Sequence, residues 1–190
     1  MPGHYANITL QGPRQDEVVL YLNETGYVAY VTPASKGCTV VYHQDLSTQE
    51  TLAEGLAAQF HCPALLVMDY GGKVLLYQLY VRGHRVDSYV STPHDGLELD
   101  GPAPAGNPEA LCDAFGRQHL CRQVEKVLRK PTDDKRGYAL AVNRHGELAN
   151  ALGLPLFAAG ASFNLIELGE MPGGPDFDPT KLVRTGARAE

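Results

Sequence analysis

The sequence lacks long apolar runs, and this absence excludes a membrane-spanning helix. Crossing a bilayer takes about 20 consecutive apolar residues, and no stretch of the chain approaches that length. Cysteine is also scarce: there are 4, none in a C-x-x-C pair, which is too few for a secreted disulfide scaffold. The N-terminal residues carry no charged segment followed by an apolar one, so we expect no signal peptide. These absences predict a cytoplasmic protein with reduced thiols and no membrane partner.

An excess of positive charge is missing too. The 16 Lys and Arg are outnumbered by 22 Asp and Glu, giving a formal net charge of −6. A nucleic-acid-binding protein normally carries a basic patch or stripe. The densest cations here are Lys126, Arg129, Lys130, Lys135 and Arg136. Arg129 and Lys130 fall where a helix should end, and the helix dipole favours cations there, so we predict no nucleic-acid partner.

Motifs for phosphate, metal and nucleophilic chemistry are absent or incomplete. Neither G-x-x-x-x-G-K-[ST] nor G-x-G-x-x-G occurs. The local candidates for a metal are the pairs His43/Asp45, His61/Cys62, His94/Asp95 and His119/Cys121. No pair has a second pair at the spacing that metal ligands require, so we predict no metal and no cofactor.

Candidate nucleophiles are equally weak, and we assign no catalytic residue. The segment Gly160–Asn164 resembles a serine elbow but lacks its final glycine and the preceding strand, which favours an ordinary turn. Cys38, Cys62 or Cys121 beside a histidine is an alternative nucleophile. A cysteine among apolar neighbours is, however, more often a small buried hydrophobe.

What the sequence does contain is a readable α+β pattern in its first 70 residues. We expect strands at Tyr5–Leu10, Tyr27–Val31, Cys38–Tyr42 and Ala64–Tyr70, and helices at Arg14–Thr25 and Ser47–Phe60. Ser47 and Glu50 fit a capping box at the start of the second helix. The order strand, helix, strand, strand, helix, strand is that of a ferredoxin-like unit. Turns at Gly71-Gly72 and Arg82-Gly83 then predict two hairpin strands, Lys73–Val81 and His84–Val90, which extend the sheet to about six strands.

Proline and glycine interrupt this pattern after the hairpins. We therefore divide the chain into a ferredoxin-like domain (1–92), a Pro/Gly-rich linker (93–108), a mixed helical extension (109–170) and a flexible tail (171–190). Within the extension we expect helices at Glu109–Phe115, from Leu120 to before Pro131 and at Arg144–Leu152, and strands at Tyr138–Val142 and Phe163–Leu168. The fold class is α+β, with a sheet extended by hairpins and a mixed helix and strand extension.

Two segments carry a resemblance to a known family. These are Tyr5-Ala6-Asn7-Ile8-Thr9-Leu10-Gln11-Gly12-Pro13 and His145-Gly146-Glu147-Leu148-Ala149-Asn150-Ala151-Leu152-Gly153-Leu154-Pro155. With them the chain resembles a family of uncharacterised bacterial cytosolic proteins. The resemblance implies a bacterial, cytoplasmic protein, and because that family has no assigned activity it assigns no functional residue.

The predicted strand Lys73–Val81 has two apolar faces, so both need cover. Two helices of a ferredoxin-like unit cover only one face of its sheet. The other is covered by the extension, by a second copy in a homodimer, or by a ligand. We therefore expect a non-enzymatic cytoplasmic binding or regulatory module that takes a protein partner or a small ligand. The alternative is an enzyme with a polar site between sheet and extension, and for either we select His145, Asn164, Glu167 and Glu170 as ligand-binding candidates.

Overall fold

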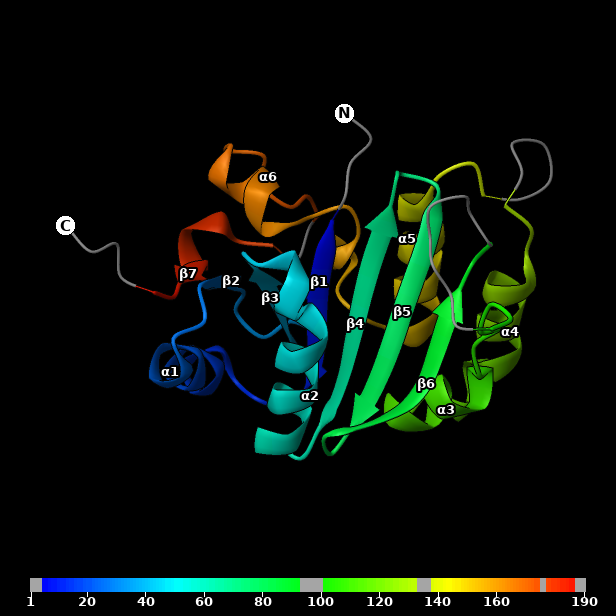
Figure 1. The fold of residues 1–190 in the computed structure, drawn as a ribbon, viewed down its shortest axis with the longest axis horizontal. Helices are drawn as coiled ribbons and strands as arrows, with labels where there is room; N and C mark the ends of the chain where they lie inside the picture. The colour runs from blue at the N-terminus through cyan, green and yellow to red at the C-terminus, as the bar shows by residue number, and fades with distance from the viewer. Residues whose placement is uncertain (1–4, 93–100, 133–137, 175–176, 187–190) are drawn as a thin grey trace.

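The computed structural model describes residues 5–92, 101–132, 138–174 and 177–186. Over these residues the chain is an α+β structure with a seven-stranded antiparallel sheet and six α-helices (Figure 1). The sheet order is β6-β5-β4-β1-β3-β2-β7. This sheet is larger than the four strands of a ferredoxin-like unit, because hairpin strands extend one edge and a C-terminal strand extends the other.

The predicted elements of residues 5–92 are confirmed. The strands of the whole sheet are β1 (Ala6–Gln11), β2 (Ala29–Val31), β3 (Cys38–His43), β4 (Pro63–Tyr70), β5 (Val74–Val81), β6 (His84–Val90) and β7 (Val183–Arg184). The helices are α1 (Gln15–Thr25), α2 (Gln49–Gln59), α3 (Pro108–Ala114), α4 (Cys121–Arg129), α5 (Ala141–Leu152) and α6 (Phe163–Glu167). Short 3₁₀ turns are η1 (Leu46–Thr48), η2 (Gln118–Leu120), η3 (Leu156–Ala158) and η4 (Pro179–Lys181).

Local signals explain both ends of α1 but not the start of α2. The Glu17 carboxylate accepts from the Arg14 backbone N–H at 2.8 Å, and Gly26 ends α1 with φ 78°. The predicted capping box of Ser47 and Glu50 is wrong. Instead, the Asp45 carboxylate accepts from both the backbone N–H and the hydroxyl of Ser47, so this hydroxyl is already used as a donor and α2 begins only at Gln49.

Helices cover both faces of the sheet. On one face α1 and α2 pack on alternate residues of β1 and β4, including Ile8, Leu10 and Leu66. On the other face α3, α4 and α5 pack on Leu65, Tyr77 and further residues of β4, β5 and β6. Figure 1 shows α2 in front of the sheet and α5 behind β4 and β5. A smaller cluster joins β3 to η3 and α6.

Two predicted strands of the extension are wrong. Tyr138–Val142 does not form a strand: α5 already begins at Ala141, and Tyr138 precedes it with its side chain 4% exposed. Phe163–Leu168 is the helix α6, whose N-terminus is capped by the Ser162 hydroxyl accepting from Leu165 N–H. The buried side chains Phe163 and Ile166 are three apart, which is the helical spacing rather than the alternation of a strand.

The described part of the predicted linker follows β6 closely. Val90 N–H donates to the Pro104 carbonyl at 2.9 Å, and Ala105 forms a bridge with Tyr89. Residues 93–100 of the linker lie outside the described residues. In the predicted tail, β7 pairs with β2, and the Thr185 hydroxyl accepts from Ala29 N–H at 2.9 Å and donates to the Tyr27 carbonyl. The described end of the tail therefore has regular structure that the sequence analysis did not expect.

This arrangement shows which of the three alternatives (the extension, a second copy or a ligand) covers the second face of the sheet. Helices α3 to α5 of the same chain bury Leu65, Leu75 and Leu79 to 1% exposure or less. The apolar face that motivated a homodimer is thus occupied within the chain, and dimerisation itself stays a prediction. None of the helices among the described residues is long and apolar enough to span a membrane.

Candidate functional site

A pocket of about 390 Å³ lies between α4 and α5, close to the end of α4. Its residues recur at helical spacing, so one face of each helix supplies a wall. The α4 wall carries Gln123, Lys126, Val127 and Lys130, the α5 wall carries Glu147, Asn150 and Ala151, and Tyr138 lies at the end of the pocket. Val127 and Ala151 are each 7% exposed and form an apolar floor beneath the polar side chains.

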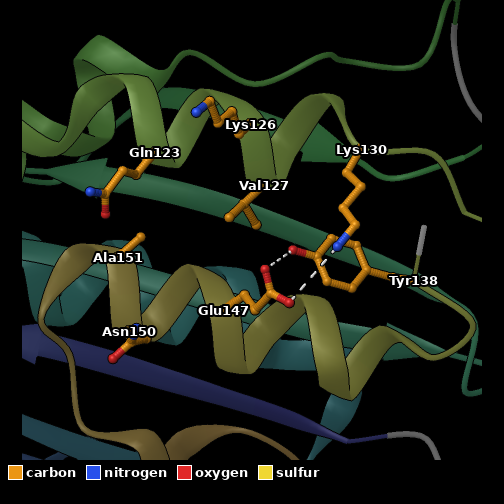
Figure 2. A pocket seen from close by; sticks show the side chains of 8 residues that line it. All are labelled: Gln123, Lys126, Val127, Lys130, Tyr138, Glu147, Asn150 and Ala151. Atoms are coloured by element: carbon orange, nitrogen blue, oxygen red, sulfur yellow. Dashed lines mark hydrogen bonds and ion pairs between the residues drawn. The ribbon is translucent and has the colours of Figure 1, made fainter. Parts of the chain in front are cut away.

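Three side chains of this pocket interact directly. Figure 2 shows Lys130, Tyr138 and Glu147 pointing toward one another from the end of α4, the segment before α5 and α5 itself. The Tyr138 hydroxyl donates to Glu147 Oε2, and Lys130 Nζ lies 4.0 Å from Glu147 Oε1. The same ammonium lies 4.4 Å from the centroid of the Tyr138 ring. Burial and the Glu147 carboxylate raise the pKa of Tyr138, so its hydroxyl keeps its proton and acts as a donor.

A buried arginine supports the pocket from behind. Arg144 is 1% exposed, and its guanidinium donates to the carbonyls of Val127 and Lys130, each at 2.7 Å. Its carbon Cζ lies 4.5 Å from the Tyr138 ring centroid. Arg144 therefore ties α5 to the last turn of α4 and holds Tyr138, which fixes the two walls relative to each other.

His145 lies buried on the side of α5 that faces away from solvent. It is 2% exposed, its Nδ1 is 3.0 Å from the Tyr5 hydroxyl, and the two rings stack with 5.7 Å between centroids. Burial lowers the pKa of His145 to about 4, so the ring is neutral near pH 7. The ring therefore lies inside the fold and cannot meet a ligand from solvent without a rearrangement of the fold.

The other predicted ligand-binding residues lie on α6 or after it. Asn164, Glu167 and Glu170 are exposed. Glu167 Oε1 accepts from the Tyr30 hydroxyl at 2.8 Å and pairs with Arg184 at 3.0 Å, so it joins α6 to β2 and β7. His145 contacts Tyr5 at β1 instead, and the four candidates do not form one described site. Their role in binding stays a prediction.

His43 and Asp45, one of the local pairs considered for a metal, are joined through Thr48. His43 Nδ1 donates to the Val28 carbonyl at 2.9 Å, and its Nε2 lies 2.9 Å from the Thr48 hydroxyl. Thr48 also lies 3.2 Å from Asp45 Oδ2. Both ring nitrogens thus have protein partners. Among the described residues no group of three or more His, Cys, Asp and Glu could hold a metal, and the pair His94/Asp95 lies outside them.

Sequence reasoning missed the α4–α5 pocket. In the sequence, Lys126 belongs to the densest group of cations and Lys130 falls at a predicted helix end, while Glu147 and Asn150 belong to a segment that assigns no functional residue. The usable signal was helical spacing: residues 123, 126, 127 and 130 share one helix face, as do 147, 150 and 151. What joins the two faces is the packing of α4 on α5, which spacing within one helix does not reveal.

Comparison of the chain with protein-family models, with curated proteins and with solved structures finds no match. The chemistry of the described residues is therefore the guide to function.

Proposed function

We propose that this protein is a non-enzymatic binding module whose α4–α5 pocket takes a small zwitterion of the amino-acid type. The proposal is based on one observation: side chains of opposite charge line the two walls of one pocket. Lys126 and Lys130 are on the α4 side and Glu147 is on the α5 side. A ligand with a carboxylate at one end and an ammonium at the other complements both walls.

Each wall has a group available to such a ligand. Lys126 is exposed, and none of the ion pairs found among the described residues involves it. Its flexible stem lets the ammonium reach a carboxylate at the rim. Glu147 is 58% exposed in its side chain and has only a long 4.0 Å contact with Lys130 at Oε1, so this oxygen can accept from a ligand ammonium. Gln123 and Asn150 add amide groups that both donate and accept.

The size and floor of the pocket fit the same ligand class. Pockets for small molecules are typically 300–1,000 Å³ and combine an apolar lining with a few placed polar groups. At about 390 Å³ this one is at the small end of that range. Val127, Ala151 and the Tyr138 ring offer apolar contact for a side chain, while the charged groups orient the backbone-like end. A purely anionic ligand is less favoured because Glu147 would repel it.

The test is a binding titration by NMR chemical shifts and calorimetry with the twenty amino acids, and with acetate and butylamine as single-charge probes. We expect at least one amino acid to perturb the amides of α4 and α5, and Glu147→Gln to weaken its binding by about tenfold, which is about 1.4 kcal/mol. Lys126→Gln should weaken binding similarly. Acetate should bind to Glu147→Gln no more weakly than to the parent, because it has no ammonium for that carboxylate to hold and the variant no longer repels it.

Matched controls lie on α4, the helix that also carries Lys126. Glu125→Gln and Arg122→Gln change the same charges at exposed α4 positions that do not line the pocket, and should leave binding unchanged. If no zwitterion perturbs α4 or α5, or if the control variants weaken binding as much as the pocket variants, the proposal is wrong.

We also infer that residues 6–70 form a ferredoxin-like unit and that the protein acts in a bacterial cytoplasm. The strand order β4-β1-β3-β2, with α1 and α2 on one face, supports the first inference. The four cysteines are free thiols, which supports a reducing compartment. The bacterial setting rests on the family resemblance of the two quoted segments.

A further inference from the structure

Lys130 and Glu147 form an exposed ion pair within the α4–α5 pocket. Nζ of Lys130 lies 4.0 Å from Glu147 Oε1, and the two side chains are 40% and 58% exposed. The same ammonium lies 4.4 Å from the centroid of the Tyr138 ring, whose hydroxyl donates to Glu147 Oε2. As Figure 2 shows, a carboxylate and an aromatic ring, joined by their own hydrogen bond, thus contact a single ammonium group.

Only the outer part of Lys130 is able to move. Its backbone N–H donates to the Lys126 carbonyl at 3.1 Å, and its carbonyl accepts from Arg144 at 2.7 Å. The backbone is therefore held, while the four-carbon stem keeps its rotational freedom. Arg144 is the other cation near the Tyr138 ring, but it is 1% exposed and donates to backbone carbonyls. Lys130 is thus the cation that can leave this ring.

The contacts of the Lys130 ammonium are weak. A separation of 4.0 Å from Glu147 Oε1 is too long for a hydrogen bond. An exposed ion pair contributes little stability, because water solvates both charges and salt screens them. A cation–π contact at an exposed position is also modest. A second ammonium that approached Glu147 more closely would therefore replace that of Lys130 at little cost.

We propose that the Tyr138 ring and the Glu147 carboxylate form a subsite for a primary alkylammonium group, from which a ligand displaces Lys130. Lys130 itself shows which chemistry fits, because its side chain ends as a butylammonium group. This inference rests on the proposed function, in which the ligand is a zwitterion. The ligand ammonium takes the place of Lys130, and the ligand carboxylate meets the displaced Lys130 together with Lys126. One internal ion pair is thereby exchanged for pairs at both ends of the ligand.

Butylamine is the matching probe, because its protonated form reproduces the Lys130 side chain. Lys130→Met keeps an apolar stem and removes the competing ammonium. We expect this variant of the full chain to bind butylamine about fivefold more tightly than the parent, which corresponds to the loss of one weak internal competitor. NMR titration at physiological ionic strength measures the two affinities. In a Glu147→Gln background, Lys130→Met should bring no such gain, because the carboxylate of the subsite is gone.

The Tyr138 ring gives a second measurement, made on the parent chain. Protons above the face of an aromatic ring resonate upfield, so the Cε protons of Lys130 should lie upfield of those of Lys126. Saturation with butylamine should return them to the position of an ordinary lysine. This readout follows the displacement itself and does not depend on how any variant folds. Circular dichroism establishes separately that Lys130→Met is folded.

Lys126→Met is the matched control, because it removes a positive charge from the same wall and leaves the Lys130–Glu147 pair intact. It should strengthen butylamine binding by about twofold at most, since salt screens separated surface charges. An equal gain in both variants, no gain in Lys130→Met, or Cε protons that stay upfield with butylamine bound would overturn the inference. If no amino acid binds but Lys130→Met still strengthens butylamine binding, the zwitterion proposal is wrong and the displacement of Lys130 stands.

Discussion

At the scale of single residues, the contact between His145 and Tyr5 shows how a buried polar pair is satisfied. The Tyr5 hydroxyl lies 3.0 Å from Nδ1 of His145, and burial raises the pKa of Tyr5, so this hydroxyl keeps its proton and can donate it to Nδ1. A neutral imidazole can accept at Nδ1, whereas a protonated ring cannot. The fold therefore selects the neutral histidine, which agrees with a pKa lowered by burial to about 4.

This selection predicts a pH-dependent stability. In the unfolded chain a histidine has a pKa of about 6.5. Between pH 6.5 and pH 4 the unfolded state therefore binds a proton that the folded state does not, and the free energy of unfolding falls as the pH falls, by at most about 3 kcal/mol. Urea unfolding at pH 7 and pH 4.5 measures this loss. Above pH 6.5 the contribution is fully present.

His145→Gln removes the titrating group, so we expect a shallower fall in stability over the same pH window. His84→Gln is the matched control because His84 is exposed on β6, and its profile should follow that of the parent. An unchanged slope in the His145 variant would show that this histidine does not set the pH dependence.

At the scale of secondary-structure elements, the end of α4 depends on side chains from elsewhere. Pro131 follows four residues after Val127 and has no N–H, so the Val127 carbonyl cannot receive the usual helical hydrogen bond. Arg144 of α5 donates to it instead, and Tyr89 of β6 donates to the Leu128 carbonyl at 2.9 Å. Helix α4 is therefore completed by its packing partners.

Arg144→Met should destabilise the protein by about 3 kcal/mol, because it leaves the buried carbonyls of Val127 and Lys130 without donors. Arg144→Lys should lose less stability than Arg144→Met, because lysine keeps a charge. It should still lose some, because lysine lacks the planar fork that reaches two carbonyls. The measurement is the urea midpoint. Arg122→Met, at an exposed position on α4, serves as the control and should change it little. Equal midpoints for Arg144→Met and the control would contradict this account of α4.

At the scale of the whole molecule, stability depends on helices that cover both faces of the sheet. Strands β4 and β5 have buried side chains on both faces, and the two covers come from different parts of the chain. Helices α1 and α2 are close in sequence to the strands they cover. Helices α3 to α5 follow the sheet and lie on its other face, so residues 5–92 do not close their own core.

We therefore expect the fragment 1–92 to associate or precipitate while the full chain remains monodisperse. Removing the rest of the chain uncovers side chains worth about 1.5–3 kcal/mol each when buried, and together these rival the net stability of a domain. The side chains concerned are Leu65, Val67, Leu75, Tyr77, Leu79 and Tyr89. Light scattering and urea unfolding provide the measurements, with a chain lacking only residues 187–190 as control. A fragment that is monomeric and unfolds cooperatively would contradict the expectation.

The sequence by itself determined the elements whose signals are local. Gly26 ends α1, the apolar spacing of Leu52 and Leu56 marks α2, and Gly71-Gly72 forms the turn between β4 and β5. Such signals depend on neighbours within a few residues. They failed at Tyr138–Val142 and Phe163–Leu168, because short apolar runs fit a strand or a helix equally well and packing decides between them.

Only the tertiary structure decided the site. The α4–α5 pocket joins Lys126 and Lys130 to Glu147, with Tyr138 between, and the pairing of β7 with β2 joins residues more than 150 positions apart. A residue's type fixes which chemistry it can perform, but its partners are set by which faces pack together. That packing is a property of the whole chain, because burying both faces of one sheet requires all of its helices.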